Sequence, residues 1–462
     1  MKIAQVASEV VPFAKTGGLA DVAGVLPLAL KELGEDVIIV MPGYKVIKDA
    51  KFAVERFKEG ISYSIIGKNI KVYFIENDKY FNRDGLYGDK NGDYKDNLDR
   101  FSYFCKRTLE LLKEINFSPD IIHCHDWQAA FIPVYLEALY KDDPFYKNTR
   151  TVFTIHNIGY QGLFPAEEFP KLGLERSFFN MEMLEFYGKI NTLKGGIVFS
   201  DIINTVSPTY SREIQTKEFG FGLEGVLGKR KTDLFGILNG LDYSAWNPQN
   251  DKFIIKNYSA QNLEDKYKNK EELQKVCNFC LKKDVALFGI VSRLAAQKGF
   301  DILAEAIPSI CKMNLQLVIL GTGESKYHSL LEGIVKKHPK VVSLYLKFDN
   351  SLAHKIYAGS DIFLMPSRYE PCGLGQMISL KYGTIPLVFK TGGLADTINV
   401  NNGFVFSNYK KEDLIKTMDN AIQRFKDKKK WLELLKGAMR YNFSWQESAK
   451  KYLQLYEQAR AK

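Results

Sequence analysis

The sequence predicts an α/β protein built from two doubly wound domains, and three observations lead to this prediction. Short apolar runs typical of buried strands alternate with stretches of helical spacing along the whole chain. The alternation stops over a polar, lysine-rich stretch between residues 239 and 275 and starts again at residue 286. In addition, the heptapeptide Lys-Thr-Gly-Gly-Leu-Ala-Asp occurs twice, at residues 15–21 and 390–396. We therefore expect two parallel sheets flanked by helices, each with a glycine-rich loop at a strand end.

Composition excludes several other classes of protein. The chain has 462 residues, of which 26% are charged and 45% apolar, a mix typical of a globular protein of two or three domains. No apolar run approaches the roughly 20 residues of a membrane span, and the first strand begins without a signal or transit segment. The net charge of +10 is spread along the chain, which favours anionic small substrates over nucleic acid. These features predict a cytoplasmic protein, or a mature form whose presequence has been removed, without a membrane or nucleic-acid partner.

The six cysteines indicate free thiols. Only Cys277 and Cys280 have CxxC spacing, and no second pair accompanies them, so a zinc site is not expected. Unpaired cysteines are typical of a reducing compartment.

The N-terminal half follows a strand-and-helix rhythm. Residues 2–7 are an apolar run, and after the glycine loop the apolar residues 19, 22, 26, 30 and 33 recur at helical spacing. Pro27 should kink this helix, and Gly34 is placed to end it. The further elements expected are strands at 36–42 and within 52–76, a loop at 80–94, a helix at 98–115, a strand at 119–127, a helix at 128–140, and strands at 151–157 and 201–207.

The C-terminal half repeats this pattern after a boundary near residue 242. Turn signals at Asn239-Gly240 and Asn247-Pro248 mark the boundary. Each later strand is followed by a loop with Gly or Ser and then by a helix, and the second heptapeptide follows the last of these strands. The expected strands are residues 286–293, 315–321, 362–366 and 385–388.

The glycine loops are the first candidate for chemistry. A glycine pair between a strand and a helix lets the backbone approach a ligand, and a helix start offers N–H groups to an anion. With Lys15 beside the first pair, a phosphate or pyrophosphate site is the functional interpretation. An ordinary tight turn is the alternative.

Two further loops carry charged residues after strands of the second half. Arg293 and Lys298 could together neutralise a diphosphate, the Arg with a planar fork and the Lys as a point charge. Glu370, before Pro-Cys-Gly, could accept hydrogen bonds from sugar hydroxyls. The alternatives are surface cations in the first loop and a helix cap in the second.

Three histidines follow strands of the first half and allow competing interpretations. His123, His125 and His156, with Asp126, resemble the HxH pattern of metal-dependent hydrolases on (β/α)₈ barrels. The restart at residue 286 argues for two domains rather than one barrel, and packing histidines are a second alternative. The serine-hydrolase and P-loop patterns are absent.

Taken together, these motifs resemble those of bacterial glycogen synthases, and more broadly of the glycogen and starch synthases that use ADP-glucose. The resemblance runs in order over almost the whole chain. It is carried by residues 15–22, 80–88, 123–127, 154–157 with 160–162, 292–299 and 370–376.

The resemblance implies the GT-B fold, in which two Rossmann-like domains face a central cleft that holds the active site. Residues 1–241 would form the N-terminal acceptor and catalytic domain, and residues 242–442 the nucleotide-sugar-binding domain. The last helix, within 443–462, would pack back on the N-terminal domain.

The family's site residues carry over where the motifs match. Arg293 and Lys298 would hold the donor diphosphate, Glu370 would bind the transferred glucose, and His156 would contact that glucose; these four are the expected catalytic residues. The expected substrate-binding residues are Lys15, Gly17, Gly18, Asp21, Asp126, Asn157, Asn239, Cys372, Gly373 and Leu374. Many relatives have Thr where this chain has Gly375, so a hydroxyl near the phosphate would be missing here.

The reaction implied is retaining transfer of glucose from ADP-glucose to the non-reducing end of an α-1,4-glucan, which elongates glycogen. No metal or other cofactor is expected, because Arg293 and Lys298 would balance the charge of the leaving diphosphate. Three alternatives stay open: another retaining GT-B transferase that uses UDP-glucose or a different acceptor, a zinc-dependent hydrolase, and a catalytically silent protein that binds glucan or nucleotide.

Overall fold

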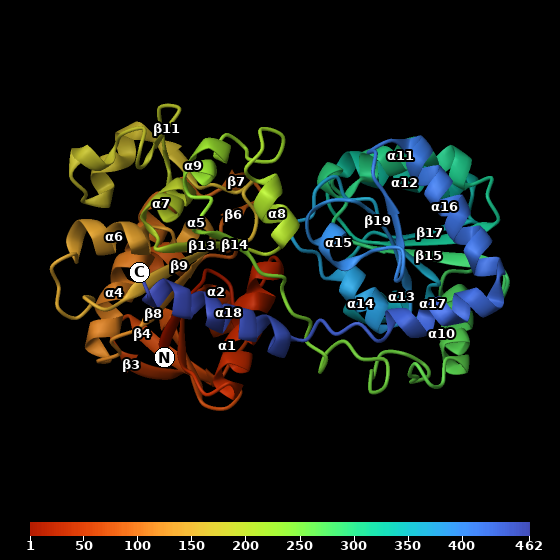
Figure 1. Cartoon of the computed structure of the whole chain (residues 1–462), viewed down its shortest axis with the longest axis horizontal. Helices are drawn as coiled ribbons and strands as arrows, with labels where there is room; N and C mark the ends of the chain where they lie inside the picture. The colour runs from red at the N-terminus through yellow and green to blue at the C-terminus, as the bar shows by residue number, and fades with distance from the viewer. The chain divides into compact units, whose positions relative to one another are not determined.

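The computed structural model describes residues 1–462 and divides into two compact units. The first unit comprises Met1–Gly240 together with Trp445–Lys462, and the second comprises Leu241–Ser444. The predicted boundary at residues 241 and 242 lies beside the break between Gly240 and Leu241. Each unit has one large sheet with helices packed around it (Figure 1).

The large sheet of the first unit has nine strands. All neighbouring pairs from β14 to β5 are parallel, whereas β4 and β3 are antiparallel. In spatial order the strands are β14 (Leu234–Gly236), β13 (Ile202–Thr205), β9 (Arg150–Ile155), β8 (Ile121–His125), β1 (Lys2–Val6), β2 (Asp36–Pro42), β5 (Ile70–Ile75), β4 (Ile61–Ile66) and β3 (Glu55–Lys58).

The register of this sheet gathers the predicted polar residues at one edge. Val6, near the end of β1, pairs with Val40 on one side and with Cys124 on the other. His125, the last residue of β8, pairs with Thr154 of β9. Because these strands are parallel, the carboxyl ends of β8 and β9, at His125 and just before His156, lie at the same edge of the sheet as the loop that carries the first heptapeptide.

The helices and small sheets of the first unit surround this sheet. The helices are α1 (Gly18–Glu32), α2 (Lys45–Asp49), α3 (Asp78–Phe81), α4 (Asn97–Glu114), α5 (Asp126–Ala129), α6 (Phe131–Leu139), α7 (Thr192–Phe199), α8 (Pro208–Glu213), α9 (Glu224–Lys229) and α18 (Trp445–Arg460), with 3₁₀ helices η1 (Ala166–Leu172) and η2 (Arg176–Phe178). The small sheets contain β6 (Gly88–Asp89) with β7 (Gly92–Asp93), and β10 (Leu163–Pro165), β12 (Lys189–Asn191) and β11 (Glu185–Phe186).

The prediction of a single helix over 128–140 is wrong in one respect, because the structure has two helices there. The first, α5, ends at Ala129, and α6 begins at Phe131. Pro133 has no N–H to donate to the Ala129 carbonyl, and proline is tolerated in the first turn of a helix. The helix therefore restarts just ahead of the proline. The loop expected at 80–94 is also interrupted, by the end of α3 and by the β6–β7 hairpin.

The last helix, α18, completes the core of the first unit. Its buried residues include Trp445, Ala449, Tyr452 and Tyr456, which recur every three or four positions and so form one face. This face packs on Val22, Leu26 and Leu30 of α1 and on strand residues such as Ile121. In Figure 1, the blue α18 accordingly lies among the red and orange elements of the N-terminal segment.

The sheet of the second unit is wholly parallel. Its strands, in spatial order, are β17 (Val342–Tyr345), β16 (Leu315–Leu320), β15 (Ala286–Val291), β18 (Ile362–Met365), β19 (Ile385–Phe389) and β20 (Phe404–Phe406). The helices are α10 (Glu264–Val276), α11 (Phe300–Ile310), α12 (Ser325–Lys337), α13 (Asn350–Gly359), α14 (Gly375–Lys381), α15 (Gly392–Thr397), α16 (Lys411–Lys426) and α17 (Lys428–Ala438), with the 3₁₀ helix η3 (Ala296–Lys298).

The strands of this sheet are mostly apolar because helices cover both of its faces. Every residue of β16, for example, is buried. No helix of either unit is long and apolar enough to span a membrane.

Candidate active site

Lys298 and Glu370, two of the predicted catalytic residues, lie side by side in the second unit. Lys298 ends η3 after β15, and Glu370 lies in the loop between β18 and α14. The Lys298 ammonium donates to Glu370 Oε2 over 2.6 Å, and the Ser367 hydroxyl donates to the same oxygen over 3.1 Å. Only 7% of the Glu370 side chain is exposed, so the ammonium compensates a carboxylate that is nearly buried.

Arg293 differs from Lys298 in its surroundings. It is exposed, and its guanidinium makes no hydrogen bond or ion pair within the protein. No contact joins it to Lys298 or Glu370 in this structure. Its donors are therefore open to an anionic ligand, to which a guanidinium can donate two parallel hydrogen bonds.

The second heptapeptide supports the Glu370 loop from behind. The Gly393 N–H donates to the Glu370 carbonyl oxygen over 3.0 Å. A Cβ on Gly392 would lie 2.0 Å from that oxygen, and a Cβ on Gly393 would lie 2.1 Å from the Cys372 oxygen. Both glycines are buried. They are glycine because the Glu370 loop passes directly against their backbone.

The residues after Glu370 form a tightly held turn. Gly373 has a φ of 72°, in the left-handed region that favours glycine. The Gln376 side chain donates to the carbonyl oxygens of Cys372 and Gly373, over 3.0 and 2.9 Å. Cys372 is 5% exposed, and Leu374 leads directly into α14. This turn fixes the backbone of the three predicted substrate-binding residues Cys372, Gly373 and Leu374.

The first heptapeptide is organised around a carboxylate that was not among the predicted site residues, Glu9. The N–H groups of Thr16 and Gly17 donate to Glu9 Oε2, the latter over 3.1 Å, and the Thr16 hydroxyl donates to Oε1 over 2.6 Å. The Tyr87 hydroxyl donates to Oε1 as well, over 2.6 Å. Two N–H groups that the sequence offered to a ligand thus bind a carboxylate of the protein itself.

A sequence signal for Glu9 did exist. It follows β1 by three positions, and polar residues after parallel strands were the rule that picked out Asp126 and His156. Burial supports its importance, because Glu9 is 4% exposed.

Lys15, Asp21 and Gly18 complete this loop. The Lys15 ammonium lies 2.7 Å from Asp21 Oδ1, and both side chains are partly exposed. Gly18 begins α1, and neither it nor Gly17 has an atom within 4 Å of an added Cβ. The first copy of the heptapeptide is therefore open where the second is packed.

Asp126 connects the loops after β8 and β9. Its Oδ1 accepts the His156 N–H over 2.7 Å, and its backbone has a φ of 55°. Burial raises the pKa of Asp126 to about 7, while N–H groups of His156 and Asn157 oppose the rise and Glu9 adds to it. The structure thus brings together three predicted residues, Asp126, His156 and Asn157. Asn239 is also buried, and its Oδ1 has no hydrogen-bond partner.

The histidines form a hydrogen-bonded chain rather than a metal site. Both ring nitrogens of His123 are bonded, to the hydroxyls of Tyr456 and Thr154, over 2.8 and 2.6 Å. Those of His125 are bonded to Gln5 Oε1 and His156 Nε2, over 2.7 and 3.0 Å. No group of three or more His, Cys, Asp or Glu side chains in the chain is arranged to hold a metal ion. The pattern that suggested a metal-dependent hydrolase is therefore not a ligand set.

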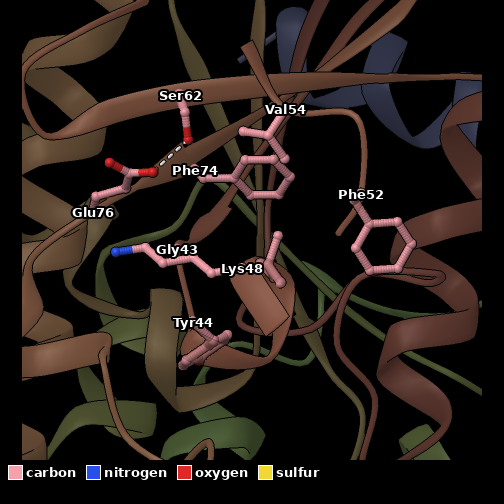
Figure 2. A pocket seen from close by; sticks show the side chains of 9 residues that line it. Gly43, Tyr44, Lys48, Phe52, Val54, Ser62, Phe74 and Glu76 are labelled. Carbon is pink, nitrogen blue, oxygen red and sulfur yellow. Dashed lines mark hydrogen bonds between the residues drawn. The ribbon is translucent and has the colours of Figure 1, made fainter. Parts of the chain in front are cut away.

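A separate cavity of about 190 Å³ opens beyond the carboxyl ends of β2 and β5. Figure 2 shows its mixed lining, in which the Ser62 hydroxyl donates to Glu76 over 2.6 Å beside the ring of Phe74, while the ring of Phe52 lies farther away. None of the predicted site residues lines it.

Comparison with known proteins matches both units. Residues 2–229 match the family model of the starch synthase catalytic domain, and residues 269–433 match that of glycosyl transferases group 1. The chain is 50% identical to the glycogen synthase of Geotalea uraniireducens, over all of this chain and 99% of that protein. It is 46% identical to the glycogen synthase of Thermotoga petrophila, with the same coverage.

A solved structure agrees with these relatives. The catalytic domain of starch synthase IV from Arabidopsis thaliana, bound to ADP and acarbose, superposes with a TM-score of 0.90 at 35% identity, covering 100% of this chain and 99% of that one. The predicted GT-B fold, with two Rossmann-like domains, is confirmed. The resemblance drawn from the motifs is confirmed as well: the chain belongs to the glycogen and starch synthase family of glycosyltransferases.

Proposed function

We propose that this protein transfers glucose from ADP-glucose to the non-reducing end of an α-1,4-glucan, with retention at the anomeric carbon, and so elongates glycogen. Its full-length similarity to glycogen synthases supports the reaction, and the ADP bound to the related starch synthase supports the donor. The observation that carries the proposal is the ion pair between Lys298 and Glu370. This pair places a cation suited to phosphate beside a carboxylate suited to sugar hydroxyls.

The second unit binds the donor in this proposal. Arg293, with its open guanidinium, and Lys298 hold the diphosphate and stabilise the charge that develops as it leaves. When the diphosphate takes over the Lys298 ammonium, Glu370 is freed to accept hydrogen bonds from glucose hydroxyls. The backbone N–H groups of Cys372, Gly373 and Leu374 bind the same ligand. They take the place of the threonine hydroxyl that is missing at Gly375.

The first unit supplies the acceptor side and groups around the transferred glucose. His156 contacts the sugar, and its carbonyl lies near the anomeric carbon; Asp126 and Asn157 fix the loop that carries it. Lys15, paired with Asp21, and the exposed glycines Gly17 and Gly18 contribute to donor binding, as does Asn239; the Gly17 N–H itself stays on Glu9. The Glu9 carboxylate keeps this loop in shape.

Retention proceeds in this proposal by attack on the same face of the sugar. The acceptor hydroxyl attacks the anomeric carbon as the diphosphate leaves, and an oxygen of the leaving phosphate takes the hydroxyl proton. Glu370, whose Oε2 accepts a hydrogen bond from the Ser367 hydroxyl, positions the sugar in this proposal and is not the nucleophile. No metal is required, since two cationic side chains balance the diphosphate. We place the reaction in the cytoplasm, where the six cysteines, none of which forms a disulfide, stay reduced.

One assay tests donor, acceptor and metal independence together. Nucleotide release is measured from ADP-glucose and from UDP-glucose, each with and without glycogen, in the presence of EDTA. We expect release of ADP that depends on glycogen, with glucose incorporated into the glucan. Turnover of UDP-glucose alone would overturn the donor, loss of activity with EDTA would overturn the metal-free mechanism, and no release by folded protein would overturn the proposed reaction.

A further inference from the structure

A chain of hydrogen bonds runs through the core of the first unit from α18 to His156. The Gln5 side-chain nitrogen donates to the Tyr456 hydroxyl over 3.0 Å. The Gln5 oxygen lies 2.7 Å from His125 Nε2, and His125 Nδ1 lies 3.0 Å from His156 Nε2. Gln5, His125 and Tyr456 are each 0% exposed. The chain thus joins a residue of the last helix to the sugar-contacting residue of the proposed site.

The orientation of Gln5 decides which ring nitrogen of each histidine carries hydrogen. An amide oxygen can only accept, so His125 Nε2 must donate to it. Burial holds the pKa of His125 well below its ordinary range, so the ring is neutral and its Nδ1 is an acceptor. His156 must then donate to that nitrogen from its own Nε2.

The second ring nitrogen of His156 is consequently a bare acceptor. Burial lowers the pKa of His156 to about 3, so the neutral ring carries a single hydrogen near neutral pH. That hydrogen is on Nε2, engaged with His125. Nδ1 therefore presents a lone pair, which can accept a hydrogen bond from a hydroxyl group.

Tyr456 holds Gln5 in the orientation that this arrangement needs. The Tyr456 hydroxyl also lies 2.8 Å from His123 Nδ1, whose ring is neutral because burial lowers its pKa. With the hydroxyl hydrogen directed to His123, the oxygen is left to accept from the Gln5 amide nitrogen. A reversed amide would place its carbonyl against that oxygen and its nitrogen against His125.

We propose that Gln5 and Tyr456 are positioning residues for His156: they keep its hydrogen on Nε2 and so present Nδ1 to a hydroxyl of the transferred sugar. The sugar contact rests on the proposed function, whereas the position of the hydrogen does not. Without Tyr456, the Gln5 amide can reverse, donate to His125 Nε2, and drive the His156 hydrogen to Nδ1. His156 would then turn a donor, rather than an acceptor, toward the sugar.

The test is the tautomer of His156 in full-length protein labelled with ¹⁵N-histidine, read from the ¹⁵N shifts of its two ring nitrogens. His156→Gln identifies the signals. We expect hydrogen on Nε2 in the wild type, and a mixture or a reversal in Tyr456→Phe. Tyr452→Phe, on the same helix but outside the Gln5–His125–His156 path, serves as the matched control and should keep the wild-type pattern. Gln5→Met, which removes both the oxygen and the nitrogen of the side-chain amide, provides a second variant should Tyr456→Phe fold poorly.

Kinetics give an independent readout. Losing one oriented hydrogen bond to the sugar predicts about a tenfold fall in kcat for ADP-glucose in Tyr456→Phe. KM for the glucan should be unchanged, because His156 contacts the transferred sugar. Hydrogen on His156 Nδ1 in the wild type, or an unchanged tautomer in both variants, would overturn the inference. If the wild type transfers no glucose, the proposed function fails. The tautomer measurement still decides whether Gln5 and Tyr456 position the His156 hydrogen.

Discussion

Lys298 and Glu370 show how two residues 72 positions apart form one functional unit. We expect Lys298→Ala to lower kcat/KM for ADP-glucose by about 10²-fold or more, the scale of removing one donor from an oxyanion hole. The variant leaves the Glu370 carboxylate nearly buried without its cation and the leaving phosphate without a donor. Steady-state measurement of nucleotide release gives kcat/KM for the variant and so checks the expected fall.

The matched control is Lys326→Ala in the same unit. Lys326 also pairs with a carboxylate, Glu324, over 2.7 Å, but its side chain is 62% exposed. Exposed pairs of this kind contribute little, so its activity should match the wild type. Normal turnover in folded Lys298→Ala protein would remove the role proposed for this lysine.

Asp126 predicts a pH dependence of stability. Burial raises its pKa to about 7, whereas an aspartate in the unfolded chain ionises near pH ~3.9. Between these values the folded protein holds a proton that the unfolded chain has released, so the stabilising contribution of protonated Asp126 is lost as pH rises from about 4 through about 7. Asp126→Asn keeps an acceptor for the His156 N–H and removes this titration.

Denaturant unfolding of both proteins as a function of pH measures this effect. The free energy of unfolding of the wild type, relative to Asp126→Asn, should fall from about pH 4 to about pH 7 and then level off. A difference that does not vary with pH would show that Asp126 is not protonated in the folded protein near pH 6.

At the scale of elements, one heptapeptide serves two different purposes. In the first copy the glycines are open to solvent at the start of α1, and in the second they pack against the Glu370 loop. Gly393→Ala should therefore destabilise the protein by about 1–3 kcal/mol, as overpacking commonly does, and should lower kcat by shifting Glu370. Thermal unfolding and nucleotide release measure the two effects.

Gly18→Ala is the matched control, since Gly18 occupies the corresponding position of the first copy. An added Cβ there has no atom within 4 Å, so the free energy of unfolding should change by less than about 0.5 kcal/mol. Equal destabilisation by the two substitutions would contradict the assignment of a packing role to the second copy.

The elements that the sequence predicted well are those whose burial leaves a clear pattern. Most parallel strands of both large sheets are apolar runs because helices cover both faces, whereas β3, at the antiparallel end of the first sheet, is charged and exposed. The β10–β12 sheet was not predicted, nor were β17 and β20, whose strands are two to four residues long. The CxxC pair, Cys277 and Cys280, follows the end of α10 at Val276.

The site was predictable to the extent that its residues follow strands. Asp126, His156, Lys298 and Glu370 all lie after parallel strands, and the structure brings them together in pairs. Their partners depend on contacts between distant segments, which no local pattern encodes. The link from His156 to Tyr456 is one example, and the packing of Gly393 against Cys372 is another.

At the scale of the whole molecule, the first unit is made from both ends of the chain. Removing residues 445–462 would uncover the faces of α1 and the central strands that α18 buries. We expect a chain ending at Ser444 to lose the thermal transition of the first unit and all glucosyl transfer, while the second unit stays folded. Calorimetry and circular dichroism measure the transitions.

A synthetic peptide of residues 445–462 should restore part of both properties when added to the shortened chain. A peptide of the same composition in scrambled order is the control, because it lacks the apolar face of α18. Native stability and activity in the shortened chain alone would show that α18 is not needed to complete the core.

The place of α18 in the chain also sets the order of folding during synthesis. Residues 1–240 leave the ribosome first, yet their core stays incomplete until residues 445–460 follow, about 200 residues later. At roughly 5–20 residues per second, the delay is on the order of 10–40 s. The second unit, which is continuous in sequence, can fold within that interval. The nascent N-terminal half meanwhile exposes the apolar surface of α1 and β8, which makes it the segment that a chaperone would bind.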